Sequence, residues 1–547
     1  MTKTMRFLSM VSLVLAGVVM MGCFHEEQFE ILPENPSSNV VIRTTTISMA
    51  GEELTRALTE HGVKTFEAGD KIAVIYQNNE GSFTKDVATL KDGDITSGGK
   101  SAKITVTLTN PKTDGIVKYY YPASMVWDNG NENYEPLYSE QDGTLGKIAS
   151  NFDYAKFEGT LAGTELPSGT LANLLAICKF TIKDGDDTDI TGDVTRLTIK
   201  NGSDVYFINP SSQSNIWVAL RPISSGNIDI YAAKTWALYK KTVTGNPTLA
   251  ANTLTPITVT APQVPGALSG LFRVNAEGDL AYFSQGNLQA QWDGTNSYWT
   301  WKFAGYQHEY IQNVQGNVNP DNPGNGDKID LFGWSSVYIN NIFGIQSSKN
   351  DNDYQSVFFD WGWVNIQNGG GNKQWRTPSK SEFDYILNWR NSETPIAGVL
   401  SARYIRVQLG AAQDNIKGIV LFPDHYVLPT LEHTTITWND INEENSPGVI
   451  LHWDDWGKME AAGAVFLPSA GYREGKVVTL AWENYPEGCY WTSTQGSGEN
   501  ADDCGVALGF DKSQANPDKY SIEIEDAYRH YGFSVRLIGP WIDNSGN

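Results

Sequence analysis

Alternation of apolar and polar residues is the feature that most limits how the first half of this chain can fold. In the segment "AKITVTLT", apolar residues alternate with Lys and Thr from Ala102 to Thr109, and "VTRLTI", "IDIYAA" and "ITVTA" repeat the pattern. A period of two places alternate side chains on opposite faces of a β-strand. No convincing helical period occurs between residues 40 and 260. We therefore expect one or two β-sandwiches whose sheets each have one face in water.

Tryptophan divides the chain into two parts. Of 17 tryptophans, 3 precede residue 268 and 14 follow it, and the stretch "TAPQVPGALSG" lies between them. A stretch rich in Pro and Gly is typical of a linker between domains. At 547 residues the chain is long enough for several domains with separate cores. We predict two unlike modules joined by a linker at residues 261–270.

The N-terminus has the layout of an export signal. Two basic residues precede the apolar run "FLSMVSLVLAGVVMM", which is too short to span a membrane, and Gly-Cys follows it. This order resembles the lipobox of bacterial lipoproteins, although Met20 stands where Leu is usual. The resemblance implies a signal peptide over residues 1–22 and acyl chains, such as palmitate, on Cys23. A secretory peptide cleaved at another position is the alternative.

Acidic residues follow Cys23 in the stretch "FHEEQFE". Glu26 and Glu27 resemble the export tag that sends lipoproteins of some anaerobic Gram-negative bacteria to the outer face of the outer membrane. The resemblance implies a protein that is lipid-anchored to the outer membrane and displayed on the cell surface or a fimbrium, with residues 23–37 as a tether. Retention in the periplasm is the alternative, because any solvated linker has a similar composition.

The overall charge argues against nucleic acid as a partner. The chain has 63 Asp and Glu against 40 Lys and Arg, a formal net charge of −23, which repels phosphate groups and anionic lipid heads. Aromatic residues make up 12% of the chain, a content that suits either exposed recognition faces or an aromatic-rich core.

Residues 38–260 resemble the fimbrillin-like lipoproteins. The matching pieces are "TRALTEHGVKTFEAGDKIAVIY", "VKYYYPAS", "LANLLAICKFTIK", "VTRLTIKN", "IWVALRP" and "NPTLAANTLTPITVT". The resemblance implies two transthyretin-like β-sandwich lobes, at residues 38–145 and 146–260, that assemble with other pilus subunits of type V by donating a strand. It also implies removal of the N-terminal strand by an Arg-specific protease, with Arg56 in "LTRA" and Arg43 as candidate cleavage sites. An ordinary surface arginine is the alternative.

The stretch "WRTPSKSEFDYILNWR", residues 375–390, predicts a short helix among strands. Ser379 and Glu382 form a capping box, and Phe383 begins an apolar stripe. The helix and the pieces "FSQGNLQ", "IDLFGW", "MEAAGAVFLPSAGYR", "YWTST" and "GFSVRL" resemble a C-type-lectin-like fold and, more distantly, formylglycine-generating enzymes. The resemblance implies an α+β C-type-lectin-like domain over residues 271–547. The fold class expected for the whole chain is mainly β.

The cysteines and catalytic motifs indicate no enzyme. Strand-like segments flank Cys489 and Cys504, and in an oxidising compartment we expect these residues to form a disulfide. Formylglycine-generating enzymes act through cysteines in this region, but the surrounding catalytic context is missing. Cys178 lies in an apolar run and is expected to be buried. The chain has no P-loop, G-x-S-x-G or zincin motif and only 7 histidines. We expect no catalytic residue, metal or cofactor.

The loops between residues 425 and 457 carry the predicted ligand-binding site. Aromatic rings among Asn, Asp and Glu can stack on sugar or peptide faces while polar groups bind their rims. The candidate ligand-binding residues are Trp438, Asn439, Asp440, Trp453, Asp454, Asp455 and Trp456. The alternative is that these rings pack inward under a long loop. "WND" also copies a fragment of calcium-dependent lectins, but the partner tripeptide is absent, so a solvated acidic loop is the simpler interpretation.

Two functions fit these observations. The first is a surface-exposed lipoprotein that acts as a fimbrial tip or accessory adhesin subunit and binds a host or microbial glycan or protein through its lectin-like domain. The second is a stand-alone lipoprotein of the outer membrane that binds glycan without joining a pilus.

Overall fold

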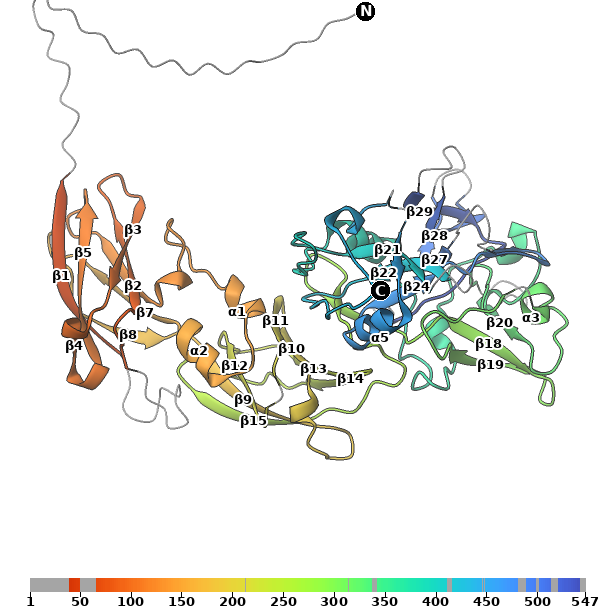
Figure 1. The fold of residues 1–547 in the computed structure, drawn as a ribbon, viewed down its shortest axis with the longest axis horizontal. Helices are drawn as coiled ribbons and strands as arrows, with labels where there is room; N and C mark the ends of the chain where they lie inside the picture. The colour runs from red at the N-terminus through yellow and green to blue at the C-terminus, as the bar shows by residue number, and fades with distance from the viewer. Residues whose placement is uncertain are drawn as a thin grey trace, which may run out of the picture.

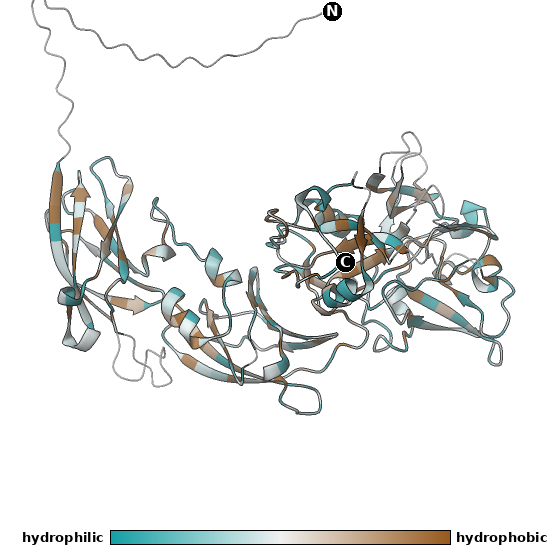
Figure 2. Ribbon diagram, viewed as in Figure 1, coloured by the Kyte–Doolittle hydropathy of each residue, from teal (hydrophilic) through white to brown (hydrophobic). Residues whose placement is uncertain are grey.

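The structure is a computed structural model of the chain and is mainly β. It describes residues 39–49, 65–211, 213–312, 314–336, 342–410, 416–444, 446, 448–480, 488–497, 501–512 and 520–541. Three units follow one another along the long axis, with β1 at one end (Figure 1). Apolar residues occur along the strands of all three units (Figure 2).

The first unit is an eight-stranded sheet that folds around its own core, in the strand order β3-β2-β6-β7-β8-β1-β5-β4. Its elements are β1 (Val40–Met49), β2 (Lys71–Gln77), β3 (Phe83–Thr89), η1 (Asp92–Asp94), β4 (Ile95–Thr96), η2 (Ser97–Gly99), β5 (Ser101–Thr109), β6 (Ile116–Tyr121), η3 (Ala123–Met125), β7 (Ala155–Thr160) and β8 (Gly169–Asn173). Between β6 and β7 the chain forms α1 (Glu135–Ser139) and α2 (Leu145–Asn151), which pack against the second unit. The predicted alternation is confirmed in β5, where each apolar residue from Ala102 to Leu108 is buried and each polar residue between them is exposed.

The second unit is a sandwich of two sheets, with strand orders β11-β10-β13-β14 and β12-β9-β15. Its elements are β9 (Ala176–Lys183), η4 (Thr191–Asp193), β10 (Arg196–Asn201), β11 (Asp204–Ile208), β12 (Ile216–Leu220), β13 (Ile228–Lys234), β14 (Ala237–Val243) and β15 (Leu254–Thr260). The predicted boundary after residue 145 precedes β7 and β8, which pair within the first sheet. The second sandwich begins with β9.

The C-terminal unit combines five small sheets with short helices. The sheets have the strand orders β16-β17-β31, β19-β18-β20, β23-β21-β22-β24, β26-β25-β30 and β27-β28-β29. The strands are β16 (Phe272–Arg273), β17 (Leu280–Phe283), β18 (Leu288–Asp293), β19 (Tyr298–Phe303), β20 (Lys328–Ile329), β21 (Tyr404–Leu409), β22 (Ile416–Leu421), β23 (Val449–Leu451), β24 (Val465–Pro468), β25 (Tyr472–Glu474), β26 (Val477–Thr479), β27 (Gly488–Gln495), β28 (Cys504–Lys512), β29 (Tyr520–Tyr528), β30 (Tyr531–Gly532) and β31 (Ile538–Gly539). The helical elements are α3 (Gln315–Val318), η5 (Ile342–Gly344), η6 (Asp351–Tyr354), η7 (Trp361–Trp363), α4 (Lys380–Asp384), η8 (Tyr385–Trp389), η9 (Trp438–Asp440) and α5 (Trp453–Ala461). The early strand β17 pairs with the last strand β31, so this unit closes on itself.

The predicted short helix is confirmed as α4, continued by one wider turn in η8. The Ser379 hydroxyl accepts a hydrogen bond from the backbone N–H of Glu382, and the Glu382 carboxylate accepts one from the N–H of Ser379. Phe383, Ile386 and Leu387 are buried against the strands of the C-terminal unit. The helix is therefore part of the scaffold.

The second and C-terminal units share one hydrophobic core, which the prediction of two modules joined by a linker did not include. Val205, Phe207 and Tyr231, from β11 and β13, cluster with Leu271 and Tyr282 of the C-terminal unit. The Phe207 ring lies 4.1 Å from the ring of His425 and beneath the Arg273 guanidinium. Burial, together with Arg273 and Arg196, lowers the pKa of His425 to about 2, so this ring is neutral in the interface. The two units are expected to move as one body.

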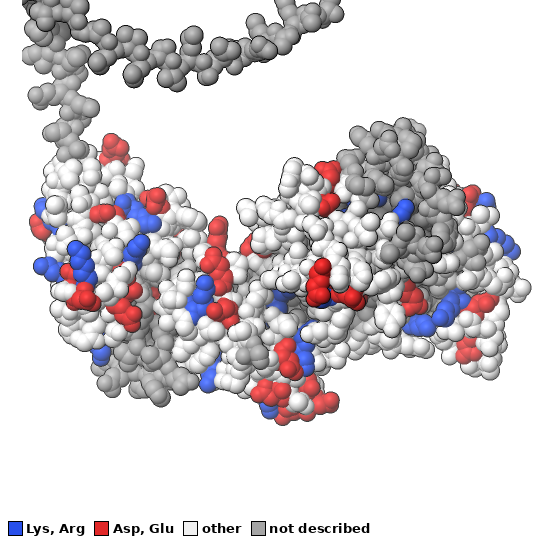
Figure 3. Space-filling model, viewed as in Figure 1, with Lys and Arg blue, Asp and Glu red and all other residues white. Residues whose placement is uncertain are grey.

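Charged side chains lie on the surface of all three units (Figure 3). Some form ion pairs between neighbouring strands, such as Lys118 of β6 with Glu158 of β7 at 3.5 Å, and Lys200 pairs with Asp279 across the shared interface at 2.7 Å. Among the described residues, no helix combines the length and the apolar character needed to cross a membrane.

Candidate functional site

A cleft in the C-terminal unit has the size and lining of a small-ligand site. Its volume is about 770 Å³, within the usual range for such sites. The segment before α4, the start of that helix and the end of the chain surround it. The lining residues are Val274, Asn275, Ala276, Phe358, Phe359, Asp360, Trp363, Arg376, Thr377, Ser379, Ser381, Glu382, Tyr385, Ser493 and Trp541.

Aromatic rings form one wall of the cleft. Trp363 is 44% exposed, stacks on Phe359 with a centroid distance of 5.7 Å, and meets Trp541 edge-on at 5.9 Å. Exposed rings that neighbouring rings hold in place can contact the apolar face of a sugar or peptide with little loss of entropy. The sequence signal for this wall is the run "FFDWGW", residues 358–363, in which Trp361 is buried and Trp363 is exposed.

Polar groups also line the cleft. Asp360 accepts hydrogen bonds from the N–H and hydroxyl of Thr377, both at 3.1 Å, and from the N–H of Gly362 at 2.8 Å. Burial raises the pKa of Asp360 to about 6, although these hydrogen bonds act against the rise. Arg376 forms two hydrogen bonds to Glu382, at 2.6 and 2.7 Å. The cleft thus combines ring faces with rigid charged groups, an arrangement suited to recognising a polar ligand.

The predicted ligand loop supplies exposed groups at two separate places. Trp438 is 67% exposed in η9, where Asn439 is also exposed and Asp440 accepts hydrogen bonds from the N–H and hydroxyl of Thr437. Trp453, at the start of α5, is 37% exposed and meets the ring of His308 edge-on at 4.8 Å. These residues are available to a ligand, but they do not line the cleft.

Two of the predicted ligand residues point inward. Trp456 is 2% exposed and packs on Phe466 at 5.6 Å, and Asp455 is fully buried. Burial raises the pKa of Asp455, but hydrogen bonds from the backbone N–H groups of Glu432 and His433 outweigh it and lower the pKa to about 2. The prediction that these two residues bind ligand is wrong, because α5 turns them toward the core as its buried face.

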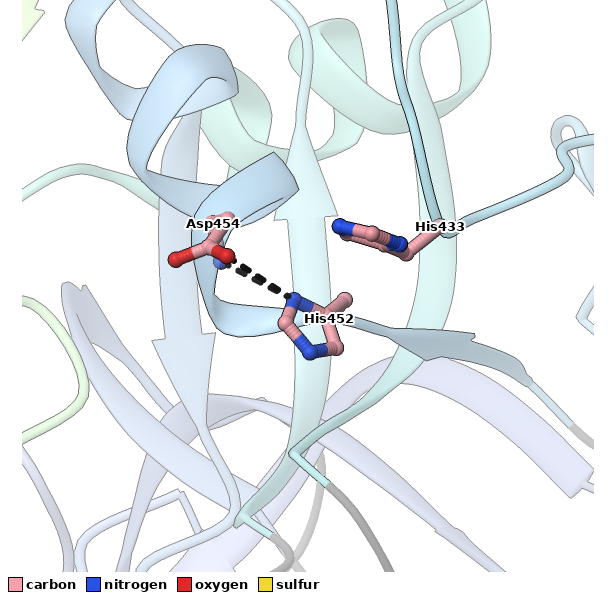
Figure 4. Close-up of side chains that lie close together, drawn as sticks. All are labelled: His433, His452 and Asp454. Carbon is pink, nitrogen blue, oxygen red and sulfur yellow. Dashed lines mark hydrogen bonds and ion pairs between the residues drawn. The ribbon is translucent and has the colours of Figure 1, made fainter.

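Three metal-ligating side chains come together beside α5, in a group that the sequence analysis missed. His433, His452 and Asp454 are exposed, and their possible ligand atoms lie within 4.8 Å of one another (Figure 4). The two histidines are 19 positions apart in the chain, a spacing that matches no known metal motif. Only the pairing of the loop with the start of α5 brings the histidines together.

Near the N-terminus, β1 lies inside the first sheet. It pairs antiparallel with β5, from Val40 opposite Thr109 to Ser48 opposite Ser101, and its end pairs parallel with β8. Arg43, a predicted cleavage site, lies within this strand. Its guanidinium donates to the carbonyl and hydroxyl of Thr164 and pairs with Glu165 at 2.9 Å. A protease could reach Arg43 only after β1 had left the sheet. Arg56 and Cys23 lie outside the described residues.

The predicted disulfide is not formed. Cys489 in β27 pairs with Gly509 in β28, whereas Cys504 is at the other end of β28, opposite Tyr528 in β29. Five residues of an extended strand span about 17 Å, which is far beyond the Cα separation that a disulfide allows. The expectation failed because the register of β27 and β28, rather than their adjacency, decides which residues face each other. Cys178 is buried, as predicted.

Comparison with known proteins gives no family assignment. The sequence matches no protein-family profile and no curated protein sequence. A candidate cell adhesion protein from Bacteroides fragilis is 11% identical, with 49% of this chain and 100% of that chain covered and a TM-score of 0.25. A fimbrial protein from Bacteroides ovatus is 9% identical over 92% of this chain and 99% of that chain, with a TM-score of 0.21. A minor pilin from Streptococcus agalactiae is 12% identical over 41% of this chain and 97% of that chain, also with a TM-score of 0.21. Scores this far below 0.5 establish neither a common family nor a common function.

Proposed function

We propose that this chain is a surface-exposed lipoprotein that acts as a fimbrial tip or accessory adhesin subunit. Its C-terminal unit, which we propose to be C-type-lectin-like, would bind a host or microbial ligand. The position of β1 carries the assembly part of this proposal. Sequence features that lie outside the described residues, the lipobox with Cys23 and the acidic stretch after it, support the anchor in the outer membrane.

An N-terminal strand in an internal position of a sheet is suited to exchange between subunits. If β1 leaves, β5 and β8 both lose a partner and expose their backbone N–H and C=O groups. A strand from another subunit would satisfy these groups along its length. Because Arg56 follows β1 and Arg43 lies within it, cleavage at Arg56 would release the whole strand. We therefore favour Arg56 as the processing site.

The cleft supports the adhesive part of the proposal. The exposed ring of Trp363 lines the same cleft as an aspartate and the Arg376–Glu382 pair, and together these groups can stack on a sugar ring and bind its hydroxyl groups. The C-terminal unit, whose residues line the cleft, lies at the opposite end of the long axis from β1 (Figure 1). Assembly and ligand binding would then use different units of the molecule.

Fractionation of the parent organism tests the proposed assembly. We expect the chain in sheared fimbriae, with a new N-terminus after residue 56. The Arg56→Ala variant should remain uncleaved and stay with the outer membrane, whereas the control Arg43→Lys, which keeps the charge in β1, should behave as the natural chain does. An uncleaved chain found only in membranes, and absent from sheared fimbriae, would reject the assembly part.

A stand-alone glycan-binding lipoprotein of the outer membrane is the second candidate. The observation that favours it is that β1 already completes the sheet within the same chain. A subunit completed in this way needs no neighbour. Retention of full ligand binding by membrane-anchored chain in cells that lack fimbriae would support this function over the first.

A further inference from the structure

The three metal-ligating side chains beside α5 come from two segments that are joined by hydrogen bonds between side chains and backbone N–H groups. His433 belongs to the loop before η9, His452 precedes the first residue of α5, and Asp454 lies in the first turn of that helix. A ring nitrogen of His433 points toward the space next to His452 and Asp454 (Figure 4). The Nδ1 atom of His452 lies 3.7 Å from a carboxylate oxygen of Asp454.

Two contacts hold the backbone of this cluster in place. The buried carboxylate of Asp455 accepts a hydrogen bond from the N–H of His433 at 2.8 Å. The hydroxyl of Thr434 accepts one from the N–H of His452 at 3.0 Å. Both histidines are therefore anchored at their backbones while their rings stay exposed, with centroids 4.6 Å apart. A site assembled in this way loses little backbone freedom when it binds an ion.

The charges around the cluster favour a cation. The start of a helix carries a positive partial charge, which by itself disfavours a bound cation. Here the carboxylates of Asp454, Asp455 and Glu432 lie close by, and Lys458 pairs with Glu432 at 2.7 Å and approaches Asp455 at 3.8 Å. Three carboxylates against one ammonium group leave a net negative charge.

We propose that His433, His452 and Asp454 bind a divalent transition-metal ion of the Zn²⁺ type. Two imidazole nitrogens and one carboxylate oxygen form a common set of zinc ligands, whereas calcium and magnesium prefer oxygen alone. Ligands of tetrahedral Zn²⁺ lie about 3.3 Å apart, as follows from bond lengths of about 2.0 Å. The present separations of up to 4.8 Å close to this value when the exposed side chains rotate.

Three protein ligands leave one position of a tetrahedral ion for water or for a donor atom of another molecule. This inference does not depend on the proposed adhesin function, because the metal site shares no residue with the cleft or with β1.

Zinc titration of the full chain tests the proposal. The chain is purified without a histidine tag, freed of metal, and titrated with zinc chloride by calorimetry, and bound zinc is counted after dialysis. We expect one Zn²⁺ per chain at this site. His433→Ala and His452→Asn should each lower the affinity for zinc by at least about 10-fold. Removing a residue that only hydrogen-bonds to a metal ligand already lowers metal affinity by this factor, and removing a ligand should cost no less. A large excess of calcium should not displace the zinc.

The variants are matched so that a folding defect can be recognised. Asn at position 452 keeps an acceptor for the N–H of Asp454, which His452 now caps at 3.3 Å, and therefore preserves the start of α5. Glu444→Gln removes an exposed carboxylate from the same loop without touching the cluster and should bind zinc as the natural chain does. Circular dichroism and thermal unfolding should be unchanged in all variants. Equal zinc binding by the natural chain and by the double variant H433A/H452A, or no zinc binding by the natural chain, would overturn the proposal.

Discussion

Two aspartates of the C-terminal unit show how desolvation and hydrogen bonds together decide the charge state of a carboxyl group. Burial raises the pKa of Asp330 to about 7, and hydrogen bonds from the N–H of Ile311 and the side chain of Asn317 offset only part of the rise. The desolvation of Asp455 is smaller, and hydrogen bonds from backbone N–H groups outweigh it and lower the pKa of this carboxyl group to about 2. Asp330 therefore tends to stay protonated below neutral pH, and Asp455 stays ionised.

The raised pKa of Asp330 predicts a pH-dependent part of the stability. Because the folded pKa lies above the unfolded value of about 4, the folded state holds a proton that the unfolded state releases between these two values. The stabilising contribution of Asp330 is complete below about pH 4, decreases as the pH rises, and is lost above about pH 7. Asp330→Asn should remove this dependence. Between pH 4.5 and 8, the free energy of unfolding in urea should decrease by on the order of 3 kcal/mol more in the natural chain than in this variant. Parallel pH profiles of the two chains would contradict the assignment.

The exposed ring of Trp363 predicts where ligand binds. Trp363→Ala should weaken binding to the chain's glycan ligand, identified on an array with the full chain, by about 10-fold, since an aromatic contact contributes about 1 kcal/mol or more. Trp236→Ala is the matched control, because Trp236 is 54% exposed but lies in the second unit. A loss on Trp438→Ala or Trp453→Ala with none on Trp363→Ala would instead place the ligand on the loop predicted from the sequence.

At the scale of elements, the sequence predicts those features that depend only on residues close together in the chain. The alternation in β5 and the capping box of α4 were both predictable, because each depends on residues a few positions apart. Which face of α5 is buried was not, since Trp453 and Trp456 lie three positions apart in one tryptophan-rich segment and only contact with Phe466 distinguishes them. The pairing of Cys489 with Gly509 was also unpredictable, because strand register depends on residues distant in the chain. The candidate site was the least predictable part of the structure, because the cleft and the histidine cluster each join segments far apart in sequence.

The capping box of α4 yields a prediction about that element. Ser379→Ala removes the acceptor for the N–H of Glu382 and should lower the free energy of unfolding of the C-terminal unit by about 1 kcal/mol. Urea unfolding followed by tryptophan fluorescence measures this change. Lys380→Ala, an exposed position in the same first turn, should change it by no more than a few tenths of a kcal/mol. Equal effects of the two substitutions would show that the cap contributes nothing.

At the scale of the whole molecule, the second sandwich and the C-terminal unit are joined by packing as well as by chain. The composition change near residue 268 is the basis for the predicted division of the chain, but composition carries no information on whether two units pack together. The face of β11, β13 and β14 that would contact solvent in an isolated sandwich is instead buried against the C-terminal unit. A fragment that begins at residue 268 would expose its half of this core to water.

Loss of a central side chain from the shared core should therefore destabilise both the second and the C-terminal unit. Phe207 is fully buried between His425 and Arg273, and Phe207→Ala should cost about 3 kcal/mol or more, as large-to-small changes in a core do. The exposed Trp236→Ala serves again as control. Residues 261–270 are held between the two units, because the N–H of Val264 donates to the carbonyl of Leu238 and Ala267 is buried in the shared core. In the variant, we expect a limiting amount of protease to cut within this segment faster than in the natural chain. Unchanged cleavage and unchanged unfolding in Phe207→Ala would mean that the two units are independent in solution, and the segment between them would then be a true linker.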